Sequence, residues 1–160
     1  MKMFKALNKI AIITFLIMSV AIVSCKDDPT PAPVDTNPIV GSWQFVSVAP
    51  EKAGTTIATL ELIPSYAPCI KDLVFKFDSN NKVTASGCES AITALAATGY
   101  LTVGSTTIWK VDNSKLKLTN GSTVQEFPIT QQATQMTITV NTNTDTTTPA
   151  VNAILVLKKV

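Results

Sequence analysis

Residues 115–129 read KLKLTNGSTVQEFPI, and this stretch decides the fold. Leu116 and Leu118 alternate with lysines, which is the two-residue period of a strand with one buried face. Asn120-Gly121 follows, and it is the strongest short signal for a tight hairpin turn because both positions accept positive φ. The chain is therefore predicted to turn back on itself here and to form an antiparallel pair of strands.

The returning strand is predicted over residues 122–129. Val124 is out of phase with Phe127, which predicts a β-bulge near residues 125–126. Pro128 is then expected near the end or edge of the strand, where a missing N–H is tolerated.

The same alternation, bounded by turn residues, predicts six further strands. In the first of them Trp43, Phe45 and Ser47 are expected on one face. Two further segments have no clear strand pattern. Residues 55–63 are expected to add an edge strand. Residues 89–97 are rich in Ala and precede a glycine, which predicts either a short helix or a loop. The six strands span residues 39–48, 70–77, 82–86, 106–111, 136–140 and 151–159.

Eight strands in one sheet would leave two open edges and one bare face. Closing the sheet, or splitting it into two packed sheets, removes this exposure. The predicted fold class is therefore all-β, an eight-stranded antiparallel up-and-down barrel. The alternative is an antiparallel β-sandwich.

The composition restricts the chemistry. The chain of 160 residues has no His, and all 13 of its basic residues are Lys. The lack of His excludes His-based catalysis and His metal ligands. The sequence has no G-x-S-x-G motif, no phosphate-binding loop, no metal cluster and no basic patch interleaved with aromatics. We expect no enzymatic activity, no cofactor, no metal and no nucleic-acid binding.

The N-terminus has the pattern of an export signal. Three lysines lie within residues 1–9, and residues 10–23 form an apolar run of 14 residues. A membrane-spanning helix needs about 20 residues, so this run is short for a membrane span. A basic start followed by a short apolar run is typical of a secretory signal. Residues 1–24 are predicted to be this signal.

Ile22-Val23-Ser24-Cys25 resembles the lipobox of bacterial lipoproteins. The resemblance implies cleavage before Cys25 and acylation of its sulfur and its new amino group with fatty acids such as palmitate. The mature chain would keep 10 lysines and 11 acids, a formal side-chain charge of −1. The alternative is an uncleaved apolar N-terminal helix with an incidental cysteine.

Lys26-Asp27-Asp28 resembles the surface-export signal of Bacteroidota lipoproteins. It implies an outer-membrane lipoprotein exposed at the cell surface; the alternative is a periplasm-facing protein with a charged linker. Residues 27–38 contain four prolines and favour an extended, semi-rigid spacer. Residues 25–38 are therefore predicted to be a lipidated tether, and residues 39–160 the barrel domain.

Cys69 and Cys88 flank the two open ends of a predicted hairpin. Hairpin geometry places them nearly opposite each other, and export provides oxidising conditions. A disulfide between them is expected to stabilise the fold by about 3 kcal/mol. Two free thiols are the alternative.

Gly41-Ser42-Trp43, at the head of the first strand, has the G-x-W pattern of the lipocalin and calycin families. Together with further residues along the chain it resembles the lipocalin-like domain of small Bacteroidota lipoproteins, over nearly all of residues 39–160. The resemblance implies that Trp43 closes the barrel floor under a basic residue of the last strand, Lys158 or Lys159. No Arg is available for this role, which departs from the classical lipocalins. The supporting residues are Cys69, Asp72, Leu73–Phe77, Asp78-Ser79-Asn80-Asn81-Lys82, Cys88, Thr107-Ile108-Trp109, Leu116–Leu118 and Asn120-Gly121.

An eight-stranded barrel is either filled by its own side chains or holds one small ligand. The expected function is a membrane-anchored binder of a small hydrophobic molecule. The alternative is a non-catalytic structural or protein-interaction module with a filled barrel and an exposed apolar patch, outside the barrel or in the loops 49–68 and 88–105. Glu126, the one inner-facing candidate acid, is expected to be exposed. The candidate ligand-lining residues are Phe45, Phe75, Phe77, Trp109, Phe127 and Met136.

Asp145-Thr146-Thr147 resembles the O-glycosylation sequon of Bacteroidota, with Thr146 as the acceptor. The alternative is a plain Thr-rich loop.

Overall fold

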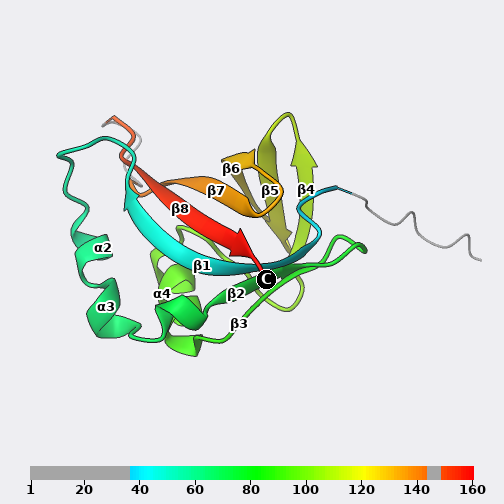
Figure 1. Ribbon diagram of the computed structural model, residues 1–160, viewed down its shortest axis with the longest axis horizontal. Helices are drawn as coiled ribbons and strands as arrows, with labels where there is room; N and C mark the ends of the chain where they lie inside the picture. The colour runs from blue at the N-terminus through cyan, green and yellow to red at the C-terminus, as the bar shows by residue number, and fades with distance from the viewer. Residues whose placement is uncertain (1–36, 144–148) are drawn as a thin grey trace, which may run out of the picture. The chain divides into compact units, whose positions relative to one another are not determined.

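The computed structural model of the protein describes residues 37–143 and 149–160 (Figure 1). Its strands correspond to the eight that the sequence predicts, and short helices lie in two of the connections. The strands are β1 (Gly41–Pro50), β2 (Val74–Phe77), β3 (Val83–Ser86), β4 (Ile108–Asp112), β5 (Lys115–Asn120), β6 (Thr123–Gln131), β7 (Gln135–Asn141) and β8 (Asn152–Lys159). The helical segments are α2 (Ala58–Glu61), α3 (Ile63–Tyr66), the 3₁₀ turn η1 (Ile70–Asp72) and α4 (Glu89–Thr98).

The strands form one eight-stranded antiparallel sheet that closes almost completely into a barrel. Strands that are consecutive in sequence pair with each other, except β3 and β4, and β1 also pairs with β8. The two strands at the ends of this order, β3 and β4, meet over a short stretch. Lys82 bridges Ile108 there, and the Val83 N–H donates to the Thr107 carbonyl at 3.1 Å. The prediction of an up-and-down barrel is confirmed, and the sandwich alternative is wrong.

The two ends of the barrel are built differently. The mouth end carries the long connections 51–73 and 87–107, and Figure 1 shows α2, α3 and α4 together at this end. The opposite end, here called the closed end, carries the chain entry at Asn37 and the end of β8. It also carries the short connections that the meander places there, residues 78–82, 113–114 and 132–134.

The β5–β6 hairpin has a continuous register, so the predicted bulge near residues 125–126 is wrong. Because the alternation is unbroken, Val124 lies outside with 50% of its surface exposed, and Gln125 turns inward. Pro128 lies inside β6 but at a local edge, as expected, because it pairs with β5 and has no partner on β7. It marks the point where β6 changes partner, since residues up to Pro128 pair with β5 and residues from Ile129 onward pair with β7.

A β-bulge is present in β1 instead. The register between β1 and β8 shifts between Phe45 and Ser47, which leaves Val46 as the extra residue. The bulge reverses the alternation, so Val48 packs against the core and Ser47 is exposed. The expectation that Ser47 shares the inner face with Phe45 is wrong.

The expectation of an edge strand at residues 55–63 is also wrong, because this segment contains α2 and the start of α3. Leu60 and Ile63 are three residues apart, which is helical spacing, and they border the same apolar space. A proline in the first turn of α3 suits a helix start, where its missing N–H has no helical partner to lose. In the same connection η1 delays the start of β2 to Val74.

The Ala-rich segment forms a helix, which decides between the two predicted alternatives. Helix α4 spans Glu89–Thr98 and buries Ala91 against the barrel. It ends at Gly99, whose left-handed backbone lets its N–H donate to the Ala96 carbonyl at 3.1 Å.

The barrel interior is packed with side chains. All six residues expected to line a ligand site are buried, with exposed fractions between 0% and 7%. The Phe77 and Trp109 rings meet edge to face, with their centroids 5.8 Å apart. Such contacts are typical of a close-packed core. The fully buried residues include Ile39, Trp43, Leu73, Val83, Leu116, Met136 and Leu157.

Candidate functional site

An apolar groove lies between α3 and α4 at the mouth end. It has a volume of about 190 Å³, and no charged side chain lines it. Residues from two separate connections form its walls: the short helices α2 and α3 on one side, and α4 with the residue after its glycine stop on the other. The principal lining residues are Leu60, Ile63, Tyr66, Ala94, Leu95 and Tyr100.

A second hollow continues from this groove toward the barrel. Its volume is about 50 Å³, and it is lined by apolar residues of β1, β7 and β8 such as Phe45, Val140 and Leu155. It shares Leu60 and Leu95 with the groove, so the two spaces adjoin. The apolar space of the described domain therefore opens at the mouth, above the packed interior.

The structure separates the six expected lining residues. Phe45 borders the mouth hollow, where its ring forms part of the floor. The other five, Phe75, Phe77, Trp109, Phe127 and Met136, border neither hollow and belong to the packed core. Sequence reasoning did not identify the helical residues that line the groove. The sequence signal for them is the apolar content of the loops 49–68 and 88–105, where an exposed apolar patch is the alternative expectation.

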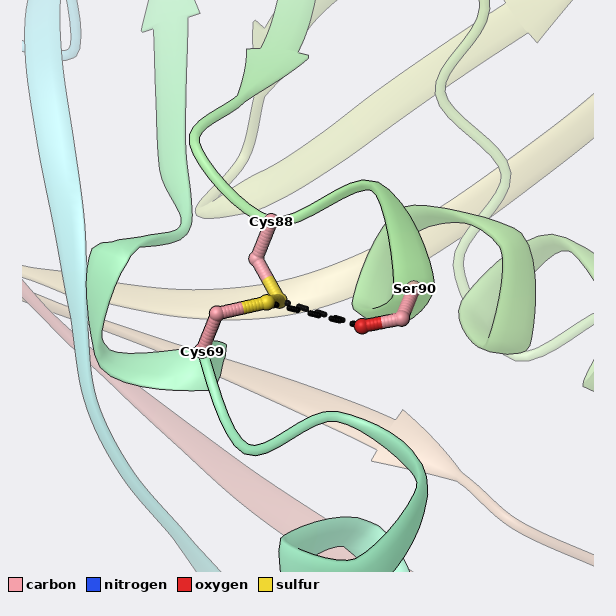
Figure 2. Close-up of a disulfide and its surroundings, with 3 residues drawn as sticks. All are labelled: Cys69, Cys88 and Ser90. Carbon is pink, nitrogen blue, oxygen red and sulfur yellow. Dashed lines mark hydrogen bonds between the residues drawn. A yellow bond between two sulfur atoms is a disulfide. The ribbon is translucent and has the colours of Figure 1, made fainter.

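The Cys69–Cys88 disulfide joins the two walls of the groove, and the prediction of this bridge is confirmed. Cys69 immediately precedes η1, and Cys88 immediately precedes α4. Figure 2 shows the Ser90 hydroxyl beside the two sulfurs, at 3.4 Å from Cys69 Sγ and 3.5 Å from Cys88 Sγ. The bridge therefore holds the start of α4 against the connection that carries α3.

Gln125 fixes the chain that follows α4. From the inner face of β6 its Nε2 donates to the Gly99 carbonyl at 2.8 Å, and its Oε1 accepts from the Thr102 N–H at 2.9 Å. An amide that bonds both a carbonyl and an N–H of one loop holds that loop in register with the strand. Sequence reasoning missed this residue because it placed a bulge here. By contrast, Glu126 points outward as expected and lies 3.7 Å from the Lys117 ammonium.

Trp43 lies at the closed end and is fully buried. Its indole Nε1 donates to the Ile39 carbonyl at 2.7 Å, and the Lys159 ammonium lies 5.4 Å from its ring centroid. Lys159 thus occupies the place of the basic residue that the lipocalin resemblance implies, whereas Lys158 is exposed beside Gln44. Gly41 has a φ of +133°, a backbone conformation that favours glycine, and a Cβ there would also displace the flexible end of the Lys159 side chain at 2.9 Å.

Several predicted site residues lie outside the described residues. They are the acylation site Cys25, the export residues Lys26, Asp27 and Asp28, and the glycosylation acceptor Thr146. Within residues 37–143 and 149–160, no group of three His, Cys, Asp or Glu side chains is placed to hold a metal ion. None of the helices in the same residues has both the length and the apolar character of a membrane span.

Comparisons of the chain with protein-family models, with curated proteins and with solved structures find no match. Membership of the lipocalin-like lipoproteins therefore stays a prediction from the sequence motifs.

Proposed function

We propose that the protein is an outer-membrane lipoprotein, acylated at Cys25 and exposed at the cell surface, whose barrel domain binds one small hydrophobic molecule at its mouth end without catalysing a reaction. The binding site is the groove between α3 and α4. The packed barrel is the rigid support on which the walls of the groove are mounted.

The observation that carries this proposal is the open, uncharged groove of about 190 Å³. Its walls consist of aliphatic and aromatic side chains, with threonines and the Tyr66 and Tyr100 phenols as the polar groups nearby. Apolar cavities of about 150 Å³ accept benzene. Pockets for drug-sized molecules occupy about 300–1,000 Å³. The groove therefore suits a neutral group the size of one aromatic ring or a short alkyl chain.

A second candidate function is a protein-interaction module. Leu62 and Tyr66 flank the groove with 48% and 68% of their surfaces exposed, and the barrel below is filled. Exposed apolar residues beside a groove are typical of surfaces that bind a partner. In this case the groove would receive an apolar side chain of another protein rather than a free molecule.

Binding of toluene to the mature chain tests the first function. In NMR spectra of the protein, the methyl signals of Ala94 and Leu95 should shift as toluene is added, and the shift should saturate. Ala94→Phe places a ring in the groove and should abolish the shift. Ala96→Phe puts the same ring on an exposed face of α4 outside the groove and should leave the shift unchanged. The absence of a saturable shift in the unmodified chain rejects the proposal. Native mass spectrometry of protein from its host then identifies a natural ligand.

A further inference from the structure

Lysines are concentrated at the closed end of the barrel. Seven of the nine described lysines lie on its short turns, on the adjoining halves of the strands or at the end of β8, and all seven are exposed. Three of the described acids lie in the same region: Asp78, Asp112 and Glu126. The formal side-chain charge of this end is therefore +4. The seven lysines are Lys76, Lys82, Lys110, Lys115, Lys117, Lys158 and Lys159.

The mouth end has the opposite sign. It carries two lysines, Lys52 and Lys71, in the connection between β1 and β2. Four of the described acids lie in the mouth-end connections and in α4, so the formal side-chain charge of the described residues at this end is −2. The described domain therefore carries a net positive charge at its closed end and a net negative charge at its mouth end. The four acids are Glu51, Glu61, Asp72 and Glu89.

Within residues 37–143 and 149–160, acids neutralise only part of the positive charge at the closed end. Among the described residues the ion pairs are Lys76 with Asp78, at 3.2 Å, and Lys117 with Glu126, at 3.7 Å. The remaining described acid of this end, Asp112, makes no ion pair within 4.0 Å. Lys82, Lys110, Lys115 and Lys158 accordingly have no ion-pair partner in the described part of the chain.

Lys110, which has no ion pair among the described residues, has a second lysine as its cross-strand neighbour. Lys110 on β4 lies directly opposite Lys117 on β5, and both face outward. Like charges in directly opposed positions destabilise an antiparallel pair. They line an outer groove of about 440 Å³ together with Lys115 and with two acids, Asp112 and Glu126. An anion bound in this groove would meet Lys110 and Lys115, the two lysines of its lining that have no ion pair among the described residues.

The tether is joined to the same end. The described chain begins at Asn37, and its side-chain oxygen accepts from the Ile39 N–H at 3.0 Å just before β1. Residues 25–36 precede it in the sequence, so an acylated Cys25 would be about 12 residues from the basic end. A chain of 12 residues spans at most about 3.6 Å per residue, so the domain would lie within about 43 Å of the anchored residue.

We infer that the closed end is a docking surface for the anionic lipid headgroups of the membrane that carries the anchor. The inference rests on the lipoprotein part of the proposed function for the position of the membrane, and on the charge distribution for the contact. Lysines attract an anionic leaflet within a Debye length. Docking would bring the lysines to the lipid phosphates and point the groove between α3 and α4 away from the bilayer.

Vesicle flotation of the non-acylated mature chain, residues 25–160 with Cys25→Ser, tests the docking surface. The chain should float with vesicles that contain phosphatidylglycerol at low salt, and not with phosphatidylcholine alone. Binding should disappear at about 1 M NaCl, where the screening length is about 3 Å. Lys110→Gln/Lys115→Gln should weaken binding about 25-fold, or about five-fold per lysine.

Lys52→Gln/Lys71→Gln is the matched control, because it removes two lysines from the mouth end. It should leave vesicle affinity unchanged. Lys110→Arg/Lys115→Arg retains both charges and should restore binding, and circular dichroism verifies the fold of each variant. Equal affinity for phosphatidylcholine, binding that resists salt, or equal losses in the two Gln pairs would overturn the inference.

The experiment is independent of the proposed ligand and of the acyl chain. If the acylation of Cys25 or the binding of toluene fails, vesicle flotation of the Cys25→Ser chain still reports on the lysines. If flotation fails while Cys25 proves to be acylated, the domain is anchored but does not dock.

Discussion

Lys159 covers the ring of Trp43, with its ammonium 5.4 Å from the ring centroid, and the two residues are direct partners between β8 and β1. The same ammonium donates to the Pro38 carbonyl at 3.2 Å. The Trp43 indole donates to the Ile39 carbonyl at 2.7 Å. One small cluster therefore joins the first strand, the last strand and the incoming chain, and it completes the closed end of the barrel.

Lys159→Met should destabilise the domain by about 1 kcal/mol. The variant keeps an apolar side chain of similar length but loses the cation–π contact, worth about 0.5–1 kcal/mol at exposed sites, and the hydrogen bond to Pro38. Urea unfolding followed by Trp fluorescence measures the difference. Lys158→Met is the control, because Lys158 is exposed and makes neither contact. Equal effects at the two positions would show that Lys159 does not stabilise the cluster.

Gly87→Ala should destabilise the domain by about 2 kcal/mol more than Gly54→Ala. Both glycines have positive φ, so the two substitutions share the cost of that conformation. A Cβ at Gly87 would overlap the Asp72 carbonyl, which is backbone and cannot swing away, whereas a Cβ at Gly54 meets open space. Thermal unfolding of the two variants gives the comparison. The result is contradicted if the two midpoints fall equally.

Cys69→Ser/Cys88→Ser should lower the free energy of unfolding by about 3 kcal/mol, because the unfolded chain loses a cross-link over 19 residues. It should also weaken toluene binding, since the walls of the groove are no longer joined. Dithiothreitol should bring the unmodified chain to the same stability and should leave the double variant unchanged. If the double variant is as stable as the oxidised chain, the disulfide does not stabilise the fold.

Local patterns were sufficient to predict the strands. The alternation in residues 115–119 and the Asn120-Gly121 turn act over short distances, and their pairing follows from the turn. The disulfide was predictable for a related reason, because one hairpin brings Cys69 and Cys88 together. Trp43 was predictable from the motif that surrounds it.

The sequence predictions were wrong where contacts between residues far apart in the chain determine the local structure. The bulge at Val46 adjusts β1 to β8, which lies more than 100 residues later, so no local signal reveals it. Residues 55–63 contain Thr and Ile and favour a strand by composition, but Leu60 and Ile63 gain apolar contacts at the barrel mouth as helical residues. The groove and the basic closed end both require the topology, because each gathers residues from separate connections.

Cys25→Ser should release the full-length protein from membranes. Acyl chains on Cys25 would provide the main attachment, since two or more chains hold a protein firmly whereas surface charge alone is reversible. Fractionation of cells in high salt, followed by immunoblotting, separates the two contributions: the unmodified protein should stay with the membranes and the variant should be soluble. Metabolic labelling with palmitate should mark the unmodified protein alone. Asp27→Ala/Asp28→Ala is the companion variant, which should keep the palmitate label but lose accessibility to protease added outside the cells. Retention of the serine variant on salt-washed membranes would mean that another segment provides the anchor.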